Sequence, residues 1–165
     1  MGCKSSEIIP MRTGGPKFSE HVMSPFKAAH TNVVTSFASL NNDSILVSAS
    51  RDKSLKCWRT KTYQNDFLKL DNLSKKDAHL DQITVIDSNM AQDELYCGCK
   101  DGTVSVWKLD IPDTLEANLN LSKVSTIHGN GGAVTALSSV EDSYGKLFVF
   151  ACQDKGIRVC KATGF

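Results

Sequence analysis

Apolar and polar positions alternate along most of this chain in short runs of four to eight residues. A period of two places one set of side chains on each face of an extended segment, so the pattern predicts β-strands. Polar turns, such as 41–44 (Asn-Asn-Asp-Ser) and Asp101-Gly102, separate the runs and predict hairpins. The expected strands are 33–40, 44–50, 54–60, 67–72, 83–89, 94–100, 103–109, 118–127, 133–140, 146–153 and 156–162.

One order of elements occurs three times along the chain. A loop histidine is followed by a strand, a turn, a second strand, a turn aspartate and a third strand. The histidines are 49 residues apart in both steps: His30, His79 and His128. Each aspartate lies six residues before an equivalent residue of the third strand: Asp52 before Trp58, Asp101 before Trp107, and Asp154 before Cys160. A repeat of this length is typical of propellers and solenoids.

The residues of these units resemble the WD-repeat family. The resemblance is carried by S-x-S-R-D-K-S-L-K-C-W at 48–58 and D-G-T-V-S-V-W at 101–107, each after a loop histidine. The family fold is a β-propeller whose blades are four-stranded antiparallel sheets. The resemblance therefore implies an all-β fold of about three blades in an incomplete ring, with repeats at about 30–72, 79–127 and 128–165.

The resemblance also implies a structural network within each blade. Asp52 is expected to bind His30, Asp101 to bind His79, and Asp154 to bind His128. The serine or threonine of the family's second strand corresponds to Ser48 or Ser50, then to Cys97 or Cys99, and then to Phe150 or Cys152. A thiol is a weak donor, and Cys160 replaces the tryptophan, so we expect looser networks in the later units.

The chain divides into a leader, 1–21, and a repeat region, 22–165. Proline and glycine residues without an apolar period predict that the leader is a flexible segment. Pro25 restricts 22–29 (VMSPFKAA) to an edge strand or a strand end. The family commonly closes its ring by pairing an amino-terminal outer strand with the last blade. We interpret the chain as the amino-terminal portion of a larger propeller, through truncation, alternative splicing or an incomplete gene model.

The amino terminus matches a lipidation pattern. Met1-Gly2-Cys3 with Ser6 fits M-G-x-x-x-[ST], in which Gly2 accepts a myristoyl chain. Cys3 is positioned for a second acyl chain, which stable anchoring requires. The predicted location is the cytoplasm, with membrane association if both residues are acylated; an unmodified start is the alternative.

Composition narrows the function classes. Apolar residues make up 41% and charged residues 22% of the 165 residues, and the net charge is +1, so no overall field favours nucleic acid. Neither a membrane-spanning run nor the apolar core of a signal peptide occurs. The six cysteines are therefore interpreted as reduced thiols.

No residue set predicts catalysis, a metal or a cofactor. Cys97 and Cys99 have one residue between them, whereas structural zinc sites use C-x₂₋₄-C. The histidines recur at one place in a repeat, which favours a structural role over a general base. The loop 129–132 (Gly-Asn-Gly-Gly) lacks the Lys and Ser/Thr of a phosphate-binding loop.

Binding of protein partners is therefore the predicted function, without a small-molecule substrate. By position in the family, five residues reach the face where partners dock: Arg51, Lys100, Gln153, Asn32 and Gln82. The two cations favour an acidic segment in the partner. The leading hypothesis is a non-catalytic scaffold or adaptor. The alternatives are a substrate receptor of a ubiquitin ligase and an accessory domain of a larger enzyme.

Overall fold

A computed structural model describes residues 30–59, 69–75, 79–89, 93–110, 119–129, 131–142 and 145–161. These residues form strands and turns without a helix, which confirms the predicted all-β fold. The strands are β1 Val34–Leu40, β2 Ile45–Ser50, β3 Leu55–Arg59, β4 Lys69–Lys75, β5 Ile83–Asn89, β6 Glu94–Cys99, β7 Thr103–Asp110, β8 Asn120–His128, β9 Val134–Asp142, β10 Gly145–Cys152 and β11 Ile157–Lys161. Within the described ranges there is also no helix long and apolar enough to cross a membrane.

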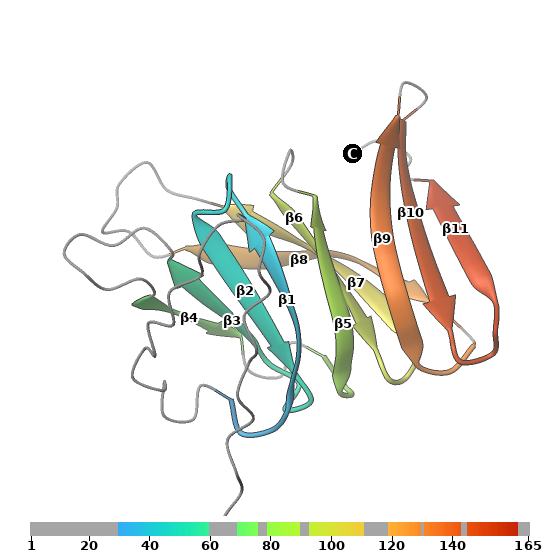
Figure 1. Ribbon diagram of the computed structural model, residues 1–165, viewed down its shortest axis with the longest axis horizontal. Coiled ribbons are helices and arrows are strands. Elements are labelled where there is room, and N and C mark those ends of the chain that lie inside the picture. The colour runs from blue at the N-terminus through green and yellow to red at the C-terminus, as the bar shows by residue number, and fades with distance from the viewer. Residues whose placement is uncertain are drawn as a thin grey trace, which may run out of the picture.

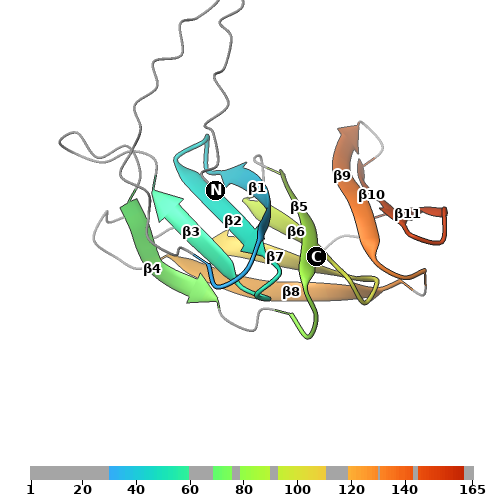
Figure 2. The same ribbon diagram turned by 60° about the horizontal axis from the view of Figure 1, so that its bottom comes forward.

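The strands form three antiparallel sheets that follow one another in chain order. The first has the order β1-β2-β3-β4 and the second β5-β6-β7-β8, while β9, β10 and β11 are the described strands of the third. The sheets stand in an open row, with β5 between β1 and β9 (Figure 1). The turned view shows the same row and the long outer strand β8 beneath it (Figure 2).

Each sheet has two faces, which we name by chain order. The near face points toward the preceding sheet, and the far face points toward the following one. The far face of the first sheet packs on the near face of the second and forms one core. Its members are Ala38, Leu40, Ile45, Val47, Ala49, Leu55 and Cys57, then Ile83, Ile86, Leu95, Cys97, Cys99, Trp107, Leu109, Leu119 and Leu121.

A second core joins the far face of the second sheet to the near face of the third. Tyr96, Val104 and Val106 pack there on Val134, Phe148, Phe150 and Cys152. Tyr96 and Phe148 are stacked with ring centroids 4.8 Å apart, which adds aromatic contact to the apolar burial. A Cβ on Gly98 would lie 2.6 Å from Val134 Cγ1, so the sheets approach this closely because residue 98 is glycine.

The register of the hairpins fixes which residues are equivalent in the three sheets. Each first strand has a bulge one residue after its start, between Val34 and Ser36, between Ile83 and Val85, and opposite the Ala151/Cys152 shift in β10. The equivalent starting positions are therefore 34, 83 and 134. The step from the first sheet to the second is 49 residues, but the step to the third is 51. This difference of two decides where the third network lies.

Candidate functional site

The first sheet contains a four-membered hydrogen-bonded network. His30 Nδ1 lies 3.0 Å from Asp52 Oδ2, and His30 Nε2 lies 2.8 Å from Ser48 Oγ. Trp58 Nε1–H donates to the same Ser48 oxygen at 2.9 Å. A carboxylate only accepts, so His30 Nδ1 carries the proton in its contact with Asp52. The loop histidine, the turn aspartate and the tryptophan of the third strand are thus joined through Ser48 of β2.

Asp52 holds the turn between β2 and β3 together. Its carboxylate also accepts from the amide of Thr31 at 2.9 Å and from the amide and hydroxyl of Ser54 at 2.9 and 2.6 Å. Burial alone would raise the pKa of Asp52. The hydrogen bonds from Ser54, Thr31 and His30 outweigh that effect and hold the pKa well below its ordinary value. The Asp52 carboxylate is therefore ionised at neutral pH.

The second sheet builds a network from different atoms. His79 Nδ1 lies 2.7 Å from Cys99 Sγ, and Nε2 lies 2.8 Å from Ser105 Oγ, which also accepts from Trp107 Nε1–H at 2.7 Å. The predicted bond from His79 to Asp101 is wrong. Asp101 is exposed and instead accepts from the amide and hydroxyl of Thr103. The Cys99 sulfur occupies the side of the imidazole that a carboxylate occupies in the first sheet.

Ser105 explains how the second network survives the loss of the serine on its second strand. Cys97 stands at the position of Ser48, and Ser105 lies across from it in the neighbouring strand β7. A hydroxyl has moved from the second strand to the third without leaving the buried site. Ser105 was not among the residues predicted from the sequence; the signal for it is a serine two residues before the tryptophan.

Burial keeps the second network uncharged. Burial and, after it, the nearby Lys123 lower the pKa of His79 to about 4, although Asp101 acts in the opposite direction. Burial also raises the pKa of the Cys99 thiol to about 12 and that of Cys97 well above its ordinary value. Reactive cysteines need a lowered pKa, so these thiols are packing and hydrogen-bonding groups. Among the described residues no group of three potential ligands is placed to hold a metal ion.

The third sheet has a solvent-facing ion pair where the histidine contact was expected. Asp154 pairs with both terminal nitrogens of Arg158, Nη1 at 3.2 Å, and accepts from the amide of Gly156. These interactions lower the pKa of Asp154 to about 2. Arg158 lies two residues before Cys160, the same position in its strand as Ser105 has before Trp107. In both later sheets, the third strand therefore supplies the side chain that differs from the first network: Ser105 in the second sheet and Arg158 in the third.

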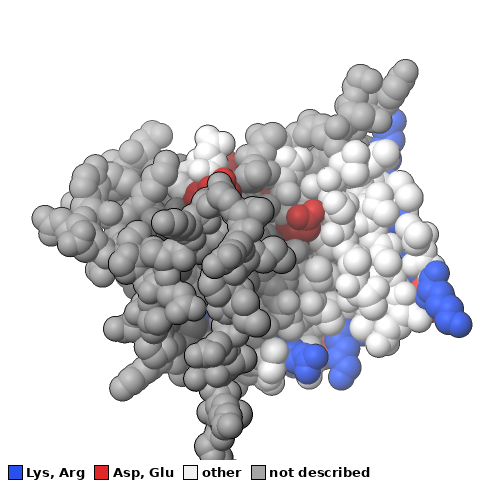
Figure 3. Space-filling view, in the orientation of Figure 1, with Lys and Arg blue, Asp and Glu red and all other residues white. Residues whose placement is uncertain are grey.

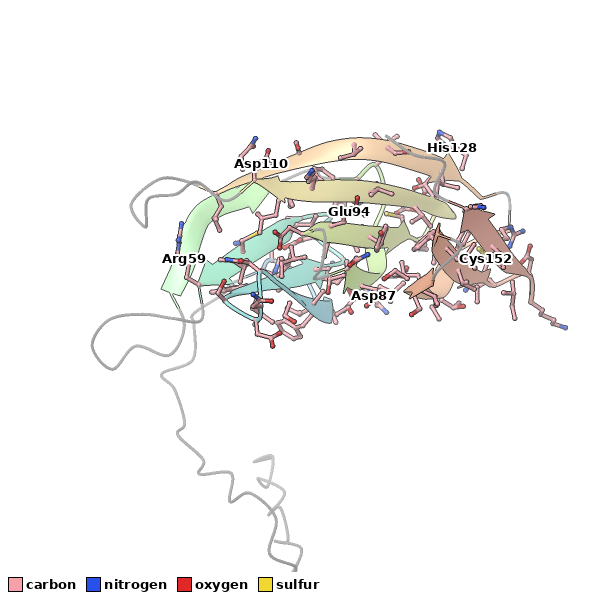
Figure 4. All side chains as sticks on the ribbon, turned by 90° about the horizontal axis from the view of Figure 1, so that it is seen from above. Arg59, Asp87, Glu94, Asp110, His128 and Cys152 are labelled. Atoms are coloured by element: carbon pink, nitrogen blue, oxygen red, sulfur yellow. The ribbon has the colours of Figure 1, made fainter. Side chains whose placement is uncertain are left out.

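The predicted pairing of Asp154 with His128 is wrong. His128 belongs to β8 of the second sheet, where it pairs with Thr103 in the backbone ladder and is exposed. Figure 4 shows it at the end of β8 next to the third sheet. Because the second step is 51 residues, the position equivalent to His30 and His79 is 130. That residue, an asparagine, lies outside the described residues.

The predicted partner-binding residues lie along one edge of the sheets, where each second strand turns into the third. Arg51, Lys100 and Gln153 stand at equivalent positions there, and we call this set the turn edge. The amide of each donates to a carbonyl just before the first strand, Val33, Gln82 and Ala133 respectively, at 2.9–3.0 Å. One backbone contact therefore presents all three side chains in the same way, and all three are exposed.

The two predicted loop residues are not equivalent to each other. Asn32 Oδ1 accepts from the next amide at 2.7 Å, and Asp81, not Gln82, does the same in the second sheet. Gln82 corresponds to Val33. The loop position beside the turn edge therefore carries Asn32 and Asp81, and Asp81 was missed because the loops were aligned one residue out of register.

Two of the three side chains of the turn edge, Arg51 and Lys100, are positively charged and exposed. No described hydrogen bond or ion pair engages the side chain of Arg51 or Lys100. Lysine and arginine atoms lie on the lower rim of the visible described surface and also at its right and upper-right margins (Figure 3). Lys53, in the first of these turns, donates to the carbonyl of Leu80 at 2.8 Å and ties the first turn to the second sheet's loop.

Comparison with known proteins agrees with this architecture. The family model described as WD domain, G-beta repeat, matches residues 21–59 and 71–108. The second matched segment begins in β4 of the first sheet and ends in β7 of the second, so a sequence repeat spans parts of two sheets. The third sheet lies outside both segments. No curated protein matches the chain at a significant level.

Proposed function

Since the chain belongs to the WD-repeat family, we propose that it is a non-catalytic scaffold or adaptor that binds protein partners through its turn edge. Proteins with these repeats generally mediate protein–protein interaction. The observation that carries the proposal is the repeated backbone contact that presents Arg51, Lys100 and Gln153 in register. Neutral buried His79 and Cys99 support a structural, not catalytic, use of the titratable groups in the core.

The partner segment we propose is acidic. Arg51 and Lys100 occupy equivalent positions in neighbouring sheets, so their charges lie on one side of the molecule. Asp81 and Asp101 lie near them and restrict the acceptable partner, because like charges placed opposite each other are unfavourable. The segment would therefore place carboxylates opposite Arg51 and Lys100 and neutral groups opposite the two aspartates.

Titration with acidic peptides tests this proposal. Replacing Lys100 with glutamine is expected to weaken binding about fivefold, the effect of losing roughly 1 kcal/mol of ion pairing, and to reduce the salt dependence. Lys108→Gln is the matched control, because Lys108 is also exposed in the second sheet but lies on strand β7 away from the turn. Equal weakening by both substitutions would contradict a role for the turn edge.

We further propose that acylation of Gly2 and Cys3, which lie outside the described residues, places this scaffold on a cytoplasmic membrane surface. The support is the sequence pattern around Gly2, Cys3 and Ser6. A single myristoyl chain binds a bilayer only marginally, so both chains are needed for stable anchoring.

Membrane fractionation tests the acylation. Gly2→Ala is expected to move the protein into the soluble fraction, because the acceptor amine is lost. Cys3→Ser is expected to leave a myristoylated protein that only partly sediments with membranes. Mass spectrometry of the amino-terminal peptide is the direct readout, and an unmodified wild-type peptide from cells with active N-myristoyltransferase would refute the proposal.

A further inference from the structure

The far face of the third sheet is exposed although its positions are buried in the other two sheets. Ile157 is 75% exposed, whereas the equivalent Leu55 and Val104 are 1% and 0% exposed. Val159 is 61% exposed, whereas the equivalent Cys57 and Val106 are 1% and 9% exposed. The side chains remain those of a packing face, so this face is suited to the near face of another sheet.

The near face of the first sheet is likewise exposed, although the equivalent positions of the second sheet are buried. Phe37 is 60% exposed, but Ile86 at the equivalent position of the second sheet is only 4% exposed. Val34 is 38% exposed, while the equivalent Ile83 is fully buried against the first sheet. Within the described part of the chain, these are the two outward faces of the row. One is a far face and the other a near face, the same combination that forms both internal cores.

Each first-strand bulge contains a threonine, and in the first two sheets this threonine hydrogen-bonds to the following sheet. Thr35 Oγ1–H donates to the carbonyl of Ile83 in the next sheet, with Oγ1 and the oxygen 3.1 Å apart. Thr84 repeats the contact with the carbonyl of Val134 at 2.6 Å. Each of the three threonines also contacts a carbonyl of its own sheet, and for Thr135 this is the Ala151 carbonyl. Among the described residues, no following sheet supplies a second acceptor to Thr135. The carbonyl equivalent to those of Ile83 and Val134 is that of Val34.

We propose that two copies of this chain associate through these faces and close a ring of six sheets. The far face of each third sheet packs on the near face of the partner's first sheet, and Thr135 donates to the partner's Val34 carbonyl. The occupant is a second copy because the required surface, an apolar near face with an acceptor at position 34, is present on the chain itself. Propeller rings close with about four to eight blades. With the three described sheets of each copy, six is the only multiple of three in that range.

Closure at two copies also follows from symmetry. A contact between two different faces forms a closed ring when the rotation closes, and an open filament when it does not. Two identical contacts related by a two-fold axis leave neither a free far face nor a free near face. The complex therefore buries the exposed side chains on both faces and does not grow further.

Light scattering of the purified full chain measures the number of copies. The expected mass is about twice 18.0 kDa at micromolar concentration. A monomer of 18.0 kDa, or an assembly that grows with concentration, overturns the proposal.

Charge substitutions identify the faces that meet. Val159→Asp and Phe37→Asp each place a carboxylate in both contacts of the ring, so each variant alone is expected to be a folded monomer by circular dichroism. Their mixture is expected to pair again, because a mixed dimer retains one unaltered contact. A Phe37→Asp variant that still dimerises would mean that two third sheets pair with each other, and a mixture that stays monomeric would equally overturn the proposal.

The threonine contact provides a finer test. Thr135→Val is expected to weaken dimerisation about 25-fold, because losing one net hydrogen bond costs roughly fivefold and the ring contains two. Thr126→Val is the matched control, because Thr126 is an exposed residue of β8 and not of a first strand. It is expected to leave the dissociation constant of the dimer unchanged. Equal effects of the two substitutions would overturn the assignment of Thr135.

Discussion

Asp52→Ala is expected to lower the free energy of unfolding by about 1–3 kcal/mol, and Asp154→Ala to lower it several times less. Asp52 accepts from His30, Thr31 and Ser54. Its removal leaves the buried donors of His30 and Ser54 without this acceptor, whereas the Thr31 amide is exposed to water. Asp154 is exposed and pairs with Arg158 at the surface, where water replaces the lost partner and salt screens the pair. The difference between the two values is the prediction.

Chemical denaturation at one fixed protein concentration measures both substitutions, because an associating chain has a concentration-dependent stability. Asp52→Asn is the matched variant, since its amide keeps one acceptor oxygen and is expected to retain part of the stability. Equal losses for Asp52→Ala and Asp154→Ala, or a larger loss for Asp154→Ala, would contradict the difference between the two sites.

The strands and the fold class were predictable because their signals are local. All eleven strands occur within a few residues of their predicted bounds, since the alternation of apolar residues and the turn residues act over short distances. The WD-repeat assignment was predictable for the same reason, because the motifs ending at Trp58 and Trp107 lie in continuous segments that the family model also matches.

The networks of the later sheets were only partly predictable. Ser105 contacts His79 and Arg158 contacts Asp154, and both contacting residues lie on the third strand of their sheet. A polar group that is moved to a neighbouring strand can occupy the same place in the fold, although its position in the sequence is different. The prediction for His128 was wrong because His128 follows His79 by 49 residues, the same distance that separates His79 from His30. The third sheet, however, begins 51 residues after the second. A count along the chain cannot detect a two-residue change in the segment between sheets, but the hairpin register reveals it.

The exposed end faces also required the structure. Leu55 and Ile157 have similar apolar side chains at equivalent positions, so the sequence predicts burial for both. Their exposures differ because, within the described ranges, Leu55 faces a following sheet and Ile157 does not. Whether a packing face is covered depends on the arrangement of whole sheets, which short-range patterns do not contain.

Acidification from pH 7 to about 4 is expected to destabilise the wild-type fold by about 3 kcal/mol through His79 alone. Its pKa is about 4 in the folded protein, against an ordinary value of 6.5, because burial disfavours the imidazolium. Between these values the unfolded chain binds a proton that the folded chain does not, so stability falls as the pH falls through this window. The low pKa of Asp52 acts separately: its contribution is complete above the ordinary carboxyl range and is lost only at more acidic pH.

Urea denaturation at pH values from 7.5 to 4.5 measures this dependence. His79→Gln is expected to be less stable at pH 7, because the ring contacts with Cys99 and Ser105 are lost, but to lose much less of its remaining stability on acidification. His128→Gln is the matched control and is expected to keep the wild-type slope, since His128 is exposed at the end of β8. A wild-type stability that is equal at pH 7 and pH 4.5 would show that the folded protein accommodates a charged His79. The neutral pairing of this imidazole with Cys99 and Ser105 would then not describe the site, because a cationic ring must donate from both nitrogens.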